Sequence, residues 1–261
     1  MLKNDKYLNR IGQINYNNQG CLMKIIEYKS ATDIIVEFQD EYHYRIRTWY
    51  DNFKKGAKKN PYAPAAFNMG RVGIKYKTTT DRKTTKEYNA WTNMLNRCYS
   101  VEFQNKNPAY TGCSVSEDWL LFESYYDWLH SQPNYDKWSG DEKWCVDKDI
   151  LFKGNKIYSS ETCCLVPDYV NTLFVKKDAS RGNLPIGVCI HKDGFQACCS
   201  NPLLNKYVYL GIYDSPEKAF QAYKNYKENL IKQIAEIEYD KENIAKRCYD
   251  AMMNYQVEIT D

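Results

Sequence analysis

The sequence predicts an α+β protein built from several small units, and three observations support this prediction. The first 61 residues carry short runs of β-branched and aromatic residues separated by polar breaks, as expected of strands. The middle of the chain has apolar residues at three- and four-residue steps, which is typical of amphipathic helices. The last third combines strand-like runs, tight turns and one long helical pattern. With 261 residues, the chain is long enough for two or three domains, at roughly 100–200 residues each.

Residues 1–61 are expected to form a small β-barrel-like module. Strand-like runs occur at Met23–Tyr28, Asp33–Phe38 and His43–Trp49, separated by the polar breaks "KSATD" and "QDE". Three short strands joined by tight turns favour a small curled sheet or barrel. The fold of such a module does not by itself identify a ligand.

Residues 62–84 are rich in Gly, Pro, Thr and Lys, which predicts an extended, partly ordered connector. From Phe53 to Tyr88 the chain has ten Lys and Arg against two acidic residues, whereas its net charge is only +3 overall. Such a block is typical of either a polyanion contact or a solvated linker, and the two interpretations stand about even. The candidate phosphate ligands are Lys54, Lys55, Lys58, Lys59, Arg71, Lys75, Lys77, Arg82 and Lys83.

Residues 85–180 are expected to form a central region of helices followed by a hairpin. Apolar residues repeat at helical spacing in "TKEYNAWTNMLNRCYS", which predicts one helix. A second helix is expected after Ser116 as N-cap, with a buried stripe of Trp119, Phe122, Tyr126 and Leu129. A short helix with Pro167 at its first position follows the hairpin, and "KKDASRGNLP" is the expected boundary.

Residues 183–240 are expected to form a three-stranded antiparallel sheet and a long helix, followed by a terminal helix within 241–261. The Asp193-Gly194 pair predicts the first hairpin turn. Ser215 is the expected N-cap of the long helix, with Pro216 at its first position. The stripe that should cover the sheet is Ala219, Ala222, Tyr223, Tyr226 and Leu230.

The C-terminal third resembles the plant ethylene-response-factor (Apetala-type) DNA-binding domain, whose relatives occur in phage integrases and homing endonucleases. The match lies in Gly187-Val188, in Gly194-Phe195-Gln196-Ala197 and in "YLGIYDSPEKAFQAY". It covers about a fifth of the chain. The resemblance implies that the sheet lies in the DNA major groove and that alternate outward side chains contact bases and phosphates. The corresponding positions here are Cys189, His191, Cys198, Ser200, Tyr207 and Tyr209, with Lys192 and Lys206 at the flanks and Gln196 within reach of a base.

That family usually carries several arginines at these positions, because the guanidinium fork matches guanine edges and phosphates. This chain carries none there. A surface that follows phosphates weakly and a face that contacts another kind of partner fit equally well.

The segment "VDKDILFKGNKIYSSETCCLVPDYVN" resembles the HNH (ββα-metal) endonuclease motif. The resemblance implies a divalent metal, a histidine general base and a further ligand on the following helix. Asp147 lies at the strand end, where the motif has a metal ligand, but the next residue is Lys148, where the motif has its general base. An ordinary lysine is protonated at neutral pH and does not accept a proton. We therefore favour a hairpin retained for its shape. If the segment is a nuclease, Asp147 and Asp149 would bind Mg²⁺, with Asn155 and Asn171 as further polar candidates.

Ten cysteines occur without any CxxC pair, which favours free thiols over a zinc site. The N-terminus lacks the apolar core of a secretion signal, and no apolar run approaches the ~18 residues of a membrane span. The whole arrangement is similar to proteins of phages and mobile elements of gut bacteria, so we expect a cytoplasmic protein of a bacterial host cell.

Three functions remain open from the sequence. The first is a nucleic-acid-binding protein, with duplex DNA as partner, without catalysis or cofactor. The second is an anti-defence protein that inhibits a host nuclease, CRISPR or other, by binding the protein or competing for DNA. The third is an HNH-like, metal-dependent homing-type endonuclease.

Overall fold

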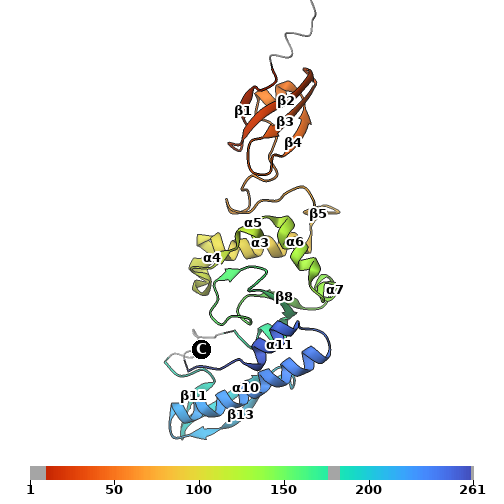
Figure 1. The fold of residues 1–261 in the computed structure, drawn as a ribbon. Coiled ribbons are helices and arrows are strands. Elements are labelled where there is room, and N and C mark those ends of the chain that lie inside the picture. Colours follow the sequence, from red (N-terminus) through yellow and green to blue (C-terminus); the bar gives the residue numbers. More distant parts are fainter. Residues whose placement is uncertain (1–9, 176–182, 260–261) are drawn as a thin grey trace, which may run out of the picture. The chain divides into compact units, whose positions relative to one another are not determined.

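The computed structural model describes residues 10–175 and 183–259, and it confirms a mixed α+β fold with several antiparallel sheets (Figure 1). The chain divides into two compact units. One contains Met1–Thr111 with Glu117–Tyr126, and the other contains Gly112–Ser116 with Asp127–Asp261. The expected boundary at 176–185 lies mostly outside the described residues. Within the described part, no helix has the length and apolar character needed to cross a membrane.

The N-terminal module is an antiparallel meander of four strands followed by a short helix. The three predicted strands are confirmed, with a further short strand before them. The elements are β1 (Ile14–Tyr16), β2 (Leu22–Ser30), β3 (Asp33–Phe38), β4 (Arg45–Thr48) and α2 (Tyr50–Lys54). The expected barrel is wrong: the order is β1-β2-β3-β4, so β1 and β4 are open edges and no closed barrel forms in the described residues.

One face of this sheet forms the core of the module. Along β3, Ile34, Val36 and Phe38 are buried at every second position, because successive side chains of a strand point to opposite faces. Phe53 of α2 packs against that face and is 3% exposed. Each such buried side chain stabilises the module by about 1.5–3 kcal/mol.

The basic connector is hydrogen-bonded to residues 120–123. It also carries a small hairpin, in which β5 (Thr79–Thr80) pairs with β6 (Lys83–Thr84). The Arg71 amide donates to the Leu120 carbonyl oxygen, and the Phe122 amide donates to the Arg71 carbonyl oxygen. The Glu123 carboxylate accepts from the backbone amides that follow Gly73. These bonds fix the connector over residues 71–75.

The helices α3 (Lys86–Tyr99), α4 (Val101–Lys106), the 3-10 turn η1 (Pro108–Tyr110) and α7 (Tyr135–Ser139) lie in the middle of the chain. The α3 stripe is confirmed, with Trp91, Met94, Leu95 and Cys98 buried. The single helix expected after Ser116 is wrong. It is two helices, α5 (Glu117–Leu120) and α6 (Phe122–Ser131), because Leu121 forms a bridge with Arg71.

Three residues of the predicted stripe, Trp119, Phe122 and Leu129, are buried despite the interruption. The prediction for Tyr126 is wrong, because this residue is half-buried and stacks on Tyr76 with ring centroids 3.7 Å apart. Its neighbour Tyr125 is buried instead, with 1% exposure.

The second unit begins with two small sheets. In one, β7 (Ser114–Val115) pairs in parallel with β9 (Ile157–Tyr158), and in the other β8 (Trp144–Asp147) pairs antiparallel with β10 (Cys164–Pro167). The short helix α8 (Asp168–Asn171) follows. Pro167 is the N-cap of α8 and not its first residue.

The C-terminal part has the predicted sheet and long helix. The strands β11 (Val188–His191), β12 (Gly194–Asn201) and β13 (Lys206–Tyr213) pair antiparallel in chain order, and α10 (Pro216–Asp240) and α11 (Lys246–Met253) follow. The Ser215 side chain accepts from the Lys218 amide, as its N-cap position predicts. Ala219, Tyr223 and Leu230 of α10 pack with Ala197 and Cys199 of β12 in one buried cluster.

Candidate nucleic-acid interface

The basic residues of the first unit fall into two local groups. The first group lies at the end of α2 and just after it. Lys54 forms an ion pair with Asp51, with Nζ 2.8 Å from Oδ1. Lys55 and Lys59 are exposed, and Lys58 is half-buried. Lys54 also lies over the ring of Tyr50. Lys54 is therefore partly committed to its own helix, while the other three have no ion-pair partner in the described part of the chain.

The second group lies on the β5–β6 hairpin and is here called the basic hairpin, residues 77–84. Lys77, Arg82 and Lys83 are exposed, and they make no ion pair with any described residue. Asp81 and Arg82 form the two-residue turn, with φ of 51° and 63°. Positive φ at both central residues is the geometry of a type I′ turn, and it holds Arg82 at the tip of the hairpin.

Two of the candidate cations differ from this arrangement. Arg71 lies in the connector and not on the hairpin, and its Nη1 donates to Glu117 Oε1 at 3.0 Å. Lys75 is exposed, and its Nζ lies 4.9 Å from the ring centroid of Tyr76. The nine candidate cations therefore differ in their surroundings, and the basic hairpin is the group in which all three cations are exposed and make no ion pair with a described residue.

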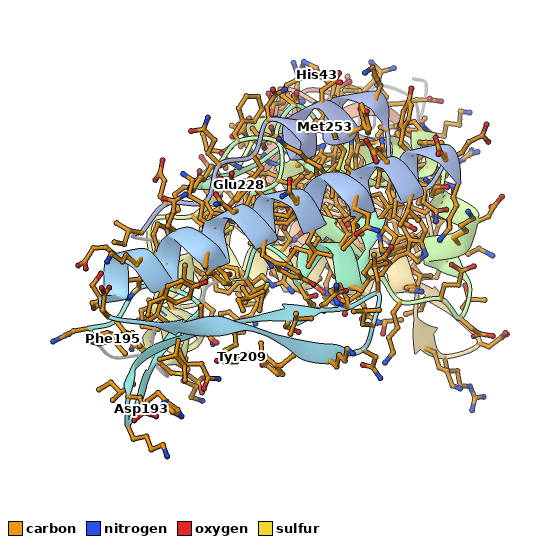
Figure 2. All side chains as sticks on the ribbon, turned by 90° about the horizontal axis from the view of Figure 1, so that it is seen from below. His43, Asp193, Phe195, Tyr209, Glu228 and Met253 are labelled. Carbon is orange, nitrogen blue, oxygen red and sulfur yellow. The ribbon has the colours of Figure 1, made fainter. Side chains whose placement is uncertain are left out.

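The open face of the C-terminal sheet lies opposite α10. In Figure 2, α10 covers one side of the strands and Tyr209 points away from it on the other. The register places Cys198 opposite Tyr209 and Ser200 opposite Tyr207, so these residues share the open face. A further row across the sheet contains Cys189, Gln196 and Ile212.

This face is aromatic and uncharged at its centre. Tyr207 is 67% exposed and Tyr209 is 60% exposed. Lys206 lies at the start of β13 and Lys192 in the β11–β12 turn, so both cations are at the margins. His191 Nδ1 accepts from the Asp193 amide at 3.3 Å, which turns the imidazole toward its own turn. Tyrosine rings there can pack on a partner, whereas direct readout of guanine would need Arg or Lys.

In the hairpin that resembles an HNH motif, Asp147 supports its own backbone. Its Oδ1 accepts from the amides of Asp149 at 2.8 Å and Ile150 at 2.7 Å. The residue is 7% exposed, and burial raises the pKa of the Asp147 carboxyl, partly countered by those two N–H donors. This carboxylate therefore closes a turn at the end of β8.

Lys148 is the residue at which the resemblance led us to expect a general base, and its ammonium group is fully hydrogen-bonded. Nζ donates to both carboxylate oxygens of Asp149, at 2.8 and 2.7 Å, and to the Asn155 carbonyl oxygen at 2.9 Å. An ammonium has three N–H donors and no lone pair, so these three acceptors satisfy it completely. The Asn155 amide in turn donates to the carbonyl oxygens of Lys148 and Ile157, which fixes the loop.

The donor set does not fit a divalent cation. Asp147 Oδ1 and both Asp149 oxygens are already engaged, and Asn171 lies in α8 without any described hydrogen bond from its amide group to the aspartates. No group of three or more His, Cys, Asp or Glu side chains suited to a metal occurs in residues 10–175 and 183–259. We therefore derive no metal-dependent step from this hairpin.

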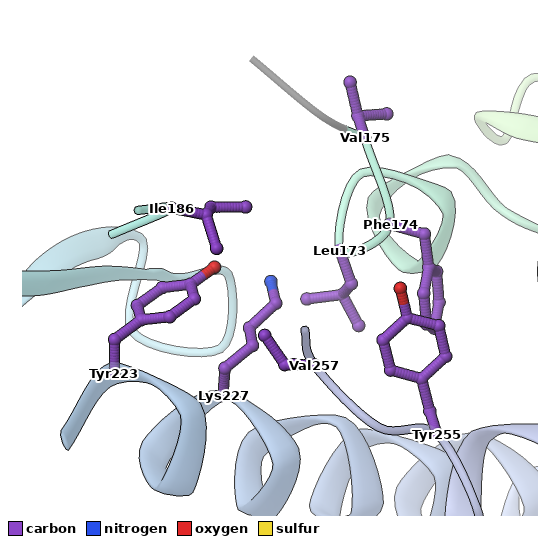
Figure 3. A pocket seen from close by; sticks show the side chains of 8 residues that line it. All are labelled: Leu173, Phe174, Val175, Ile186, Tyr223, Lys227, Tyr255 and Val257. Carbon is purple, nitrogen blue, oxygen red and sulfur yellow. The ribbon is translucent and has the colours of Figure 1, made fainter. Parts of the chain in front are cut away.

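One buried charge was missed by the sequence analysis. Lys227 of α10 is 8% exposed and points into a small pocket between Ile186, Tyr223 and Leu173 (Figure 3). Among the described residues its Nζ has no hydrogen-bond or ion-pair partner, and burial lowers the pKa of the Lys227 ammonium. The signal was present in the sequence, because Lys227 follows Tyr223 by four residues and so falls on the buried stripe of the helix.

Comparisons with models of protein families, with curated proteins and with solved structures gave no match to this chain.

Proposed function

We propose that the protein binds nucleic acid, with duplex DNA as its main target, and does not hydrolyse it. The observation that carries the proposal is the basic hairpin, which presents Lys77, Arg82 and Lys83 without ion pairs in the described chain. Unpaired exposed cations are available to replace the counterions of a phosphate backbone, whereas paired ones must first break an existing contact. The turn formed by Asp81 and Arg82 holds Arg82 at the tip of the hairpin.

The proposal that the protein does not hydrolyse nucleic acid is based on the hydrogen bonds of Lys148, in the loop after β8. A general base needs a free lone pair, and Lys148 has none while its three N–H groups are bonded to Asp149 and Asn155. If the protein is incubated in excess with supercoiled DNA and Mg²⁺, Mn²⁺ or Zn²⁺, we expect no nicking. Nicking that Asp147→Ala abolishes would establish the endonuclease function instead.

Binding is tested by gel shift on duplex DNA at a series of salt concentrations. The logarithm of affinity should fall linearly with the logarithm of salt, with a slope of about −0.9 for each phosphate contact. The double variant Arg82→Ala/Lys83→Ala should reduce that slope by about 2.

The matched control removes two exposed lysines that are already ion-paired, Lys106 with Glu102 and Lys246 with Asp250. Lys106→Ala/Lys246→Ala makes the same change in net charge and should leave the slope close to that of the parent protein. An affinity that does not change from low to moderate salt would refute the proposal, as would equal slopes for the two double variants.

A specific observation favours one second candidate, an anti-defence protein that binds a host nuclease. The open sheet face is aromatic and has no arginine, and protein interfaces are enriched in tyrosine and depleted in lysine at their centre. This candidate predicts a stoichiometric complex with a nuclease from host lysate freed of DNA, lost in Tyr209→Glu. Retention of the same partner by that variant would exclude the sheet face.

A further inference from the structure

A second concave site lies in the first unit, at the edge of the N-terminal sheet. Its volume is about 220 Å³, and Gln39, Glu41, Tyr42, Tyr62, Pro64 and Arg71 are among its lining residues. Pockets for drug-sized ligands are usually about 300–1,000 Å³, so this one is suited to a single ring system.

Two stacked tyrosines form the aromatic wall of the site. The rings of Tyr42 and Tyr62 lie 4.3 Å apart between centroids and only 9° from parallel. Tyr44 meets Tyr62 edge-on, with centroids 6.1 Å apart and an angle of 62° between the rings. Partial burial raises the pKa of both the Tyr42 and the Tyr62 hydroxyl, so both rings stay neutral at physiological pH. The two rings therefore form a stacked pair in which each ring has one face against the other.

The rim of the site provides both hydrogen-bond donors and acceptors. The Arg71 guanidinium uses one nitrogen for Glu117, and a guanidinium has five N–H donors, so further donors remain. The Gln39 amide nitrogen donates to Glu37, while its carbonyl oxygen has no partner in the described chain. The Glu41 carboxylate is exposed on the same rim, and it is hydrogen-bonded to the Tyr42 hydroxyl.

Asp40 is not part of this free set. Its Oδ1 accepts from the Tyr42 amide at 3.1 Å, and its Oδ2 accepts from the Asn60 side chain. Both oxygens thus hold the wall in place. Lys58 and Lys59 directly precede Asn60 in the loop that leads to Tyr62. Two cations without ion pairs in the described chain therefore lie in the same loop as the aromatic wall.

We propose that this site binds one unstacked nucleobase of a single-stranded nucleic acid, with its phosphates on Lys58 and Lys59. A base has a flat π-face for Tyr42 or Tyr62 and a polar edge with donors and acceptors for the rim. Aromatic platforms beside cations are the usual means of binding single strands without sequence preference. The inference deepens the proposed nucleic-acid function, and it concerns a different site and a different strand form from the basic hairpin.

The test uses the full chain and a fluorescent oligothymidylate of about ten nucleotides, within the usual range of single-strand site sizes. Tyr62→Leu should weaken binding about tenfold, within the loss expected for one base stack. Tyr62→Phe retains the ring and should stay within about twofold of the parent protein. The loss in Tyr62→Leu should persist at high salt, because stacking does not depend on counterion release.

A second measurement does not depend on a variant that folds. The parent protein is photo-crosslinked to an oligonucleotide that carries 5-iodouracil, and the modified peptides are identified by mass spectrometry. Crosslinks at Tyr42 or Tyr62 support the proposal. Crosslinks confined to other peptides, or equal affinities of Tyr62→Leu and Tyr62→Phe, overturn it.

The two proposals fail separately. If Tyr62→Leu binds single strands normally while Arg82→Ala/Lys83→Ala reduces the salt slope of duplex binding as expected, the base site alone is refuted. If duplex DNA does not bind but oligothymidylate binds in a Tyr62-dependent way, duplex recognition is refuted and the base site stands.

Discussion

Replacing Gly187 with alanine should separate the C-terminal sheet from α10, because the position requires glycine for two independent reasons. Gly187 has φ of +76°, in the left-handed region. A Cβ atom there would lie 2.0 Å from Cδ2 and 2.3 Å from Cγ of Tyr223. The Tyr223 ring is 5% exposed and belongs to the buried cluster under the sheet, so it has little room to move.

The expected loss in the free energy of unfolding is the sum of a conformational cost and a steric cost. The left-handed conformation costs a residue with a Cβ about 1–2 kcal/mol. Carbon atoms in contact normally lie about 3.5–4.0 Å apart, so the ring must move by about 1.5 Å or the strand must shift. Overpacking of this kind costs about 1–3 kcal/mol. We therefore expect Gly187→Ala to lower the free energy of unfolding of this region by about 2–5 kcal/mol.

The matched control is Gly154→Ala, because Gly154 has the same φ of +76° but nothing within 4 Å of its added Cβ. It should show only the conformational term, about 1–2 kcal/mol. The assay is chemical denaturation combined with hydrogen exchange of β12 peptides, because the chain has two units and a single transition is not assured. Exchange in β12 should accelerate in Gly187→Ala and not in Gly154→Ala.

Equal losses in Gly187→Ala and Gly154→Ala would refute the reasoning, because they would leave no energy for the contact with Tyr223. The double variant Gly187→Ala/Tyr223→Leu tests the same contact in another way. If the ring is the obstacle, the two substitutions should be less destabilising together than the sum of their separate effects.

Three further predictions concern buried ionisable groups. Lys227→Met should raise the free energy of unfolding at pH 7 by about 1–3 kcal/mol, because it removes an ammonium that lacks a described partner. Burial lowers the pKa of Lys227 in the folded state, so the unfolded chain binds more protons than the folded chain. As pH rises above that folded-state pKa, the free energy of unfolding should therefore increase in the parent protein. It should increase less in Lys227→Met. Burial raises the pKa of Cys163 to about 12, so iodoacetamide at pH 8 should modify the exposed Cys189 first, as peptide mass spectrometry would show, and early modification of Cys163 would contradict this burial. Asp147→Ala should cost about 2 kcal/mol by removing the acceptor of two amides, whereas Asp147→Asn keeps an acceptor oxygen and should stay within about 1 kcal/mol of the parent protein in denaturation.

The elements that the sequence predicted are those with strong local signals. The α3 stripe repeats at helical spacing, and Ser215 and Pro216 mark the start of α10, so both helices were predicted at their true positions. The Asp193-Gly194 pair likewise marked the β11–β12 turn. In each case the signal lies in residues that are adjacent or one helical turn apart in the sequence, and the pattern is therefore visible without tertiary structure.

The elements that the sequence did not predict depend on contacts between distant segments. The break between α5 and α6 comes from backbone bonds to Arg71, which lies 50 residues before Leu121. No local pattern of α5 or α6 contains that information, because the segment has no Gly or Pro that would mark a break. Closure of the N-terminal sheet into a barrel likewise depends on a distant contact, because the edge strands β1 and β4 would have to pair. They do not pair.

The polar residues of the loop between β8 and β9 hold its backbone in place. Asp147 accepts from two amides and so shapes the turn after β8, while Asn155 bonds to the backbone on both sides of the loop. Lys148 joins these two turns, because its ammonium bonds both the Asp149 carboxylate and the Asn155 carbonyl oxygen. A histidine in place of Lys148 could not donate three hydrogen bonds to the same acceptors. Lys148 therefore strengthens the loop, and an ammonium that donates three hydrogen bonds has no lone pair with which to accept a proton.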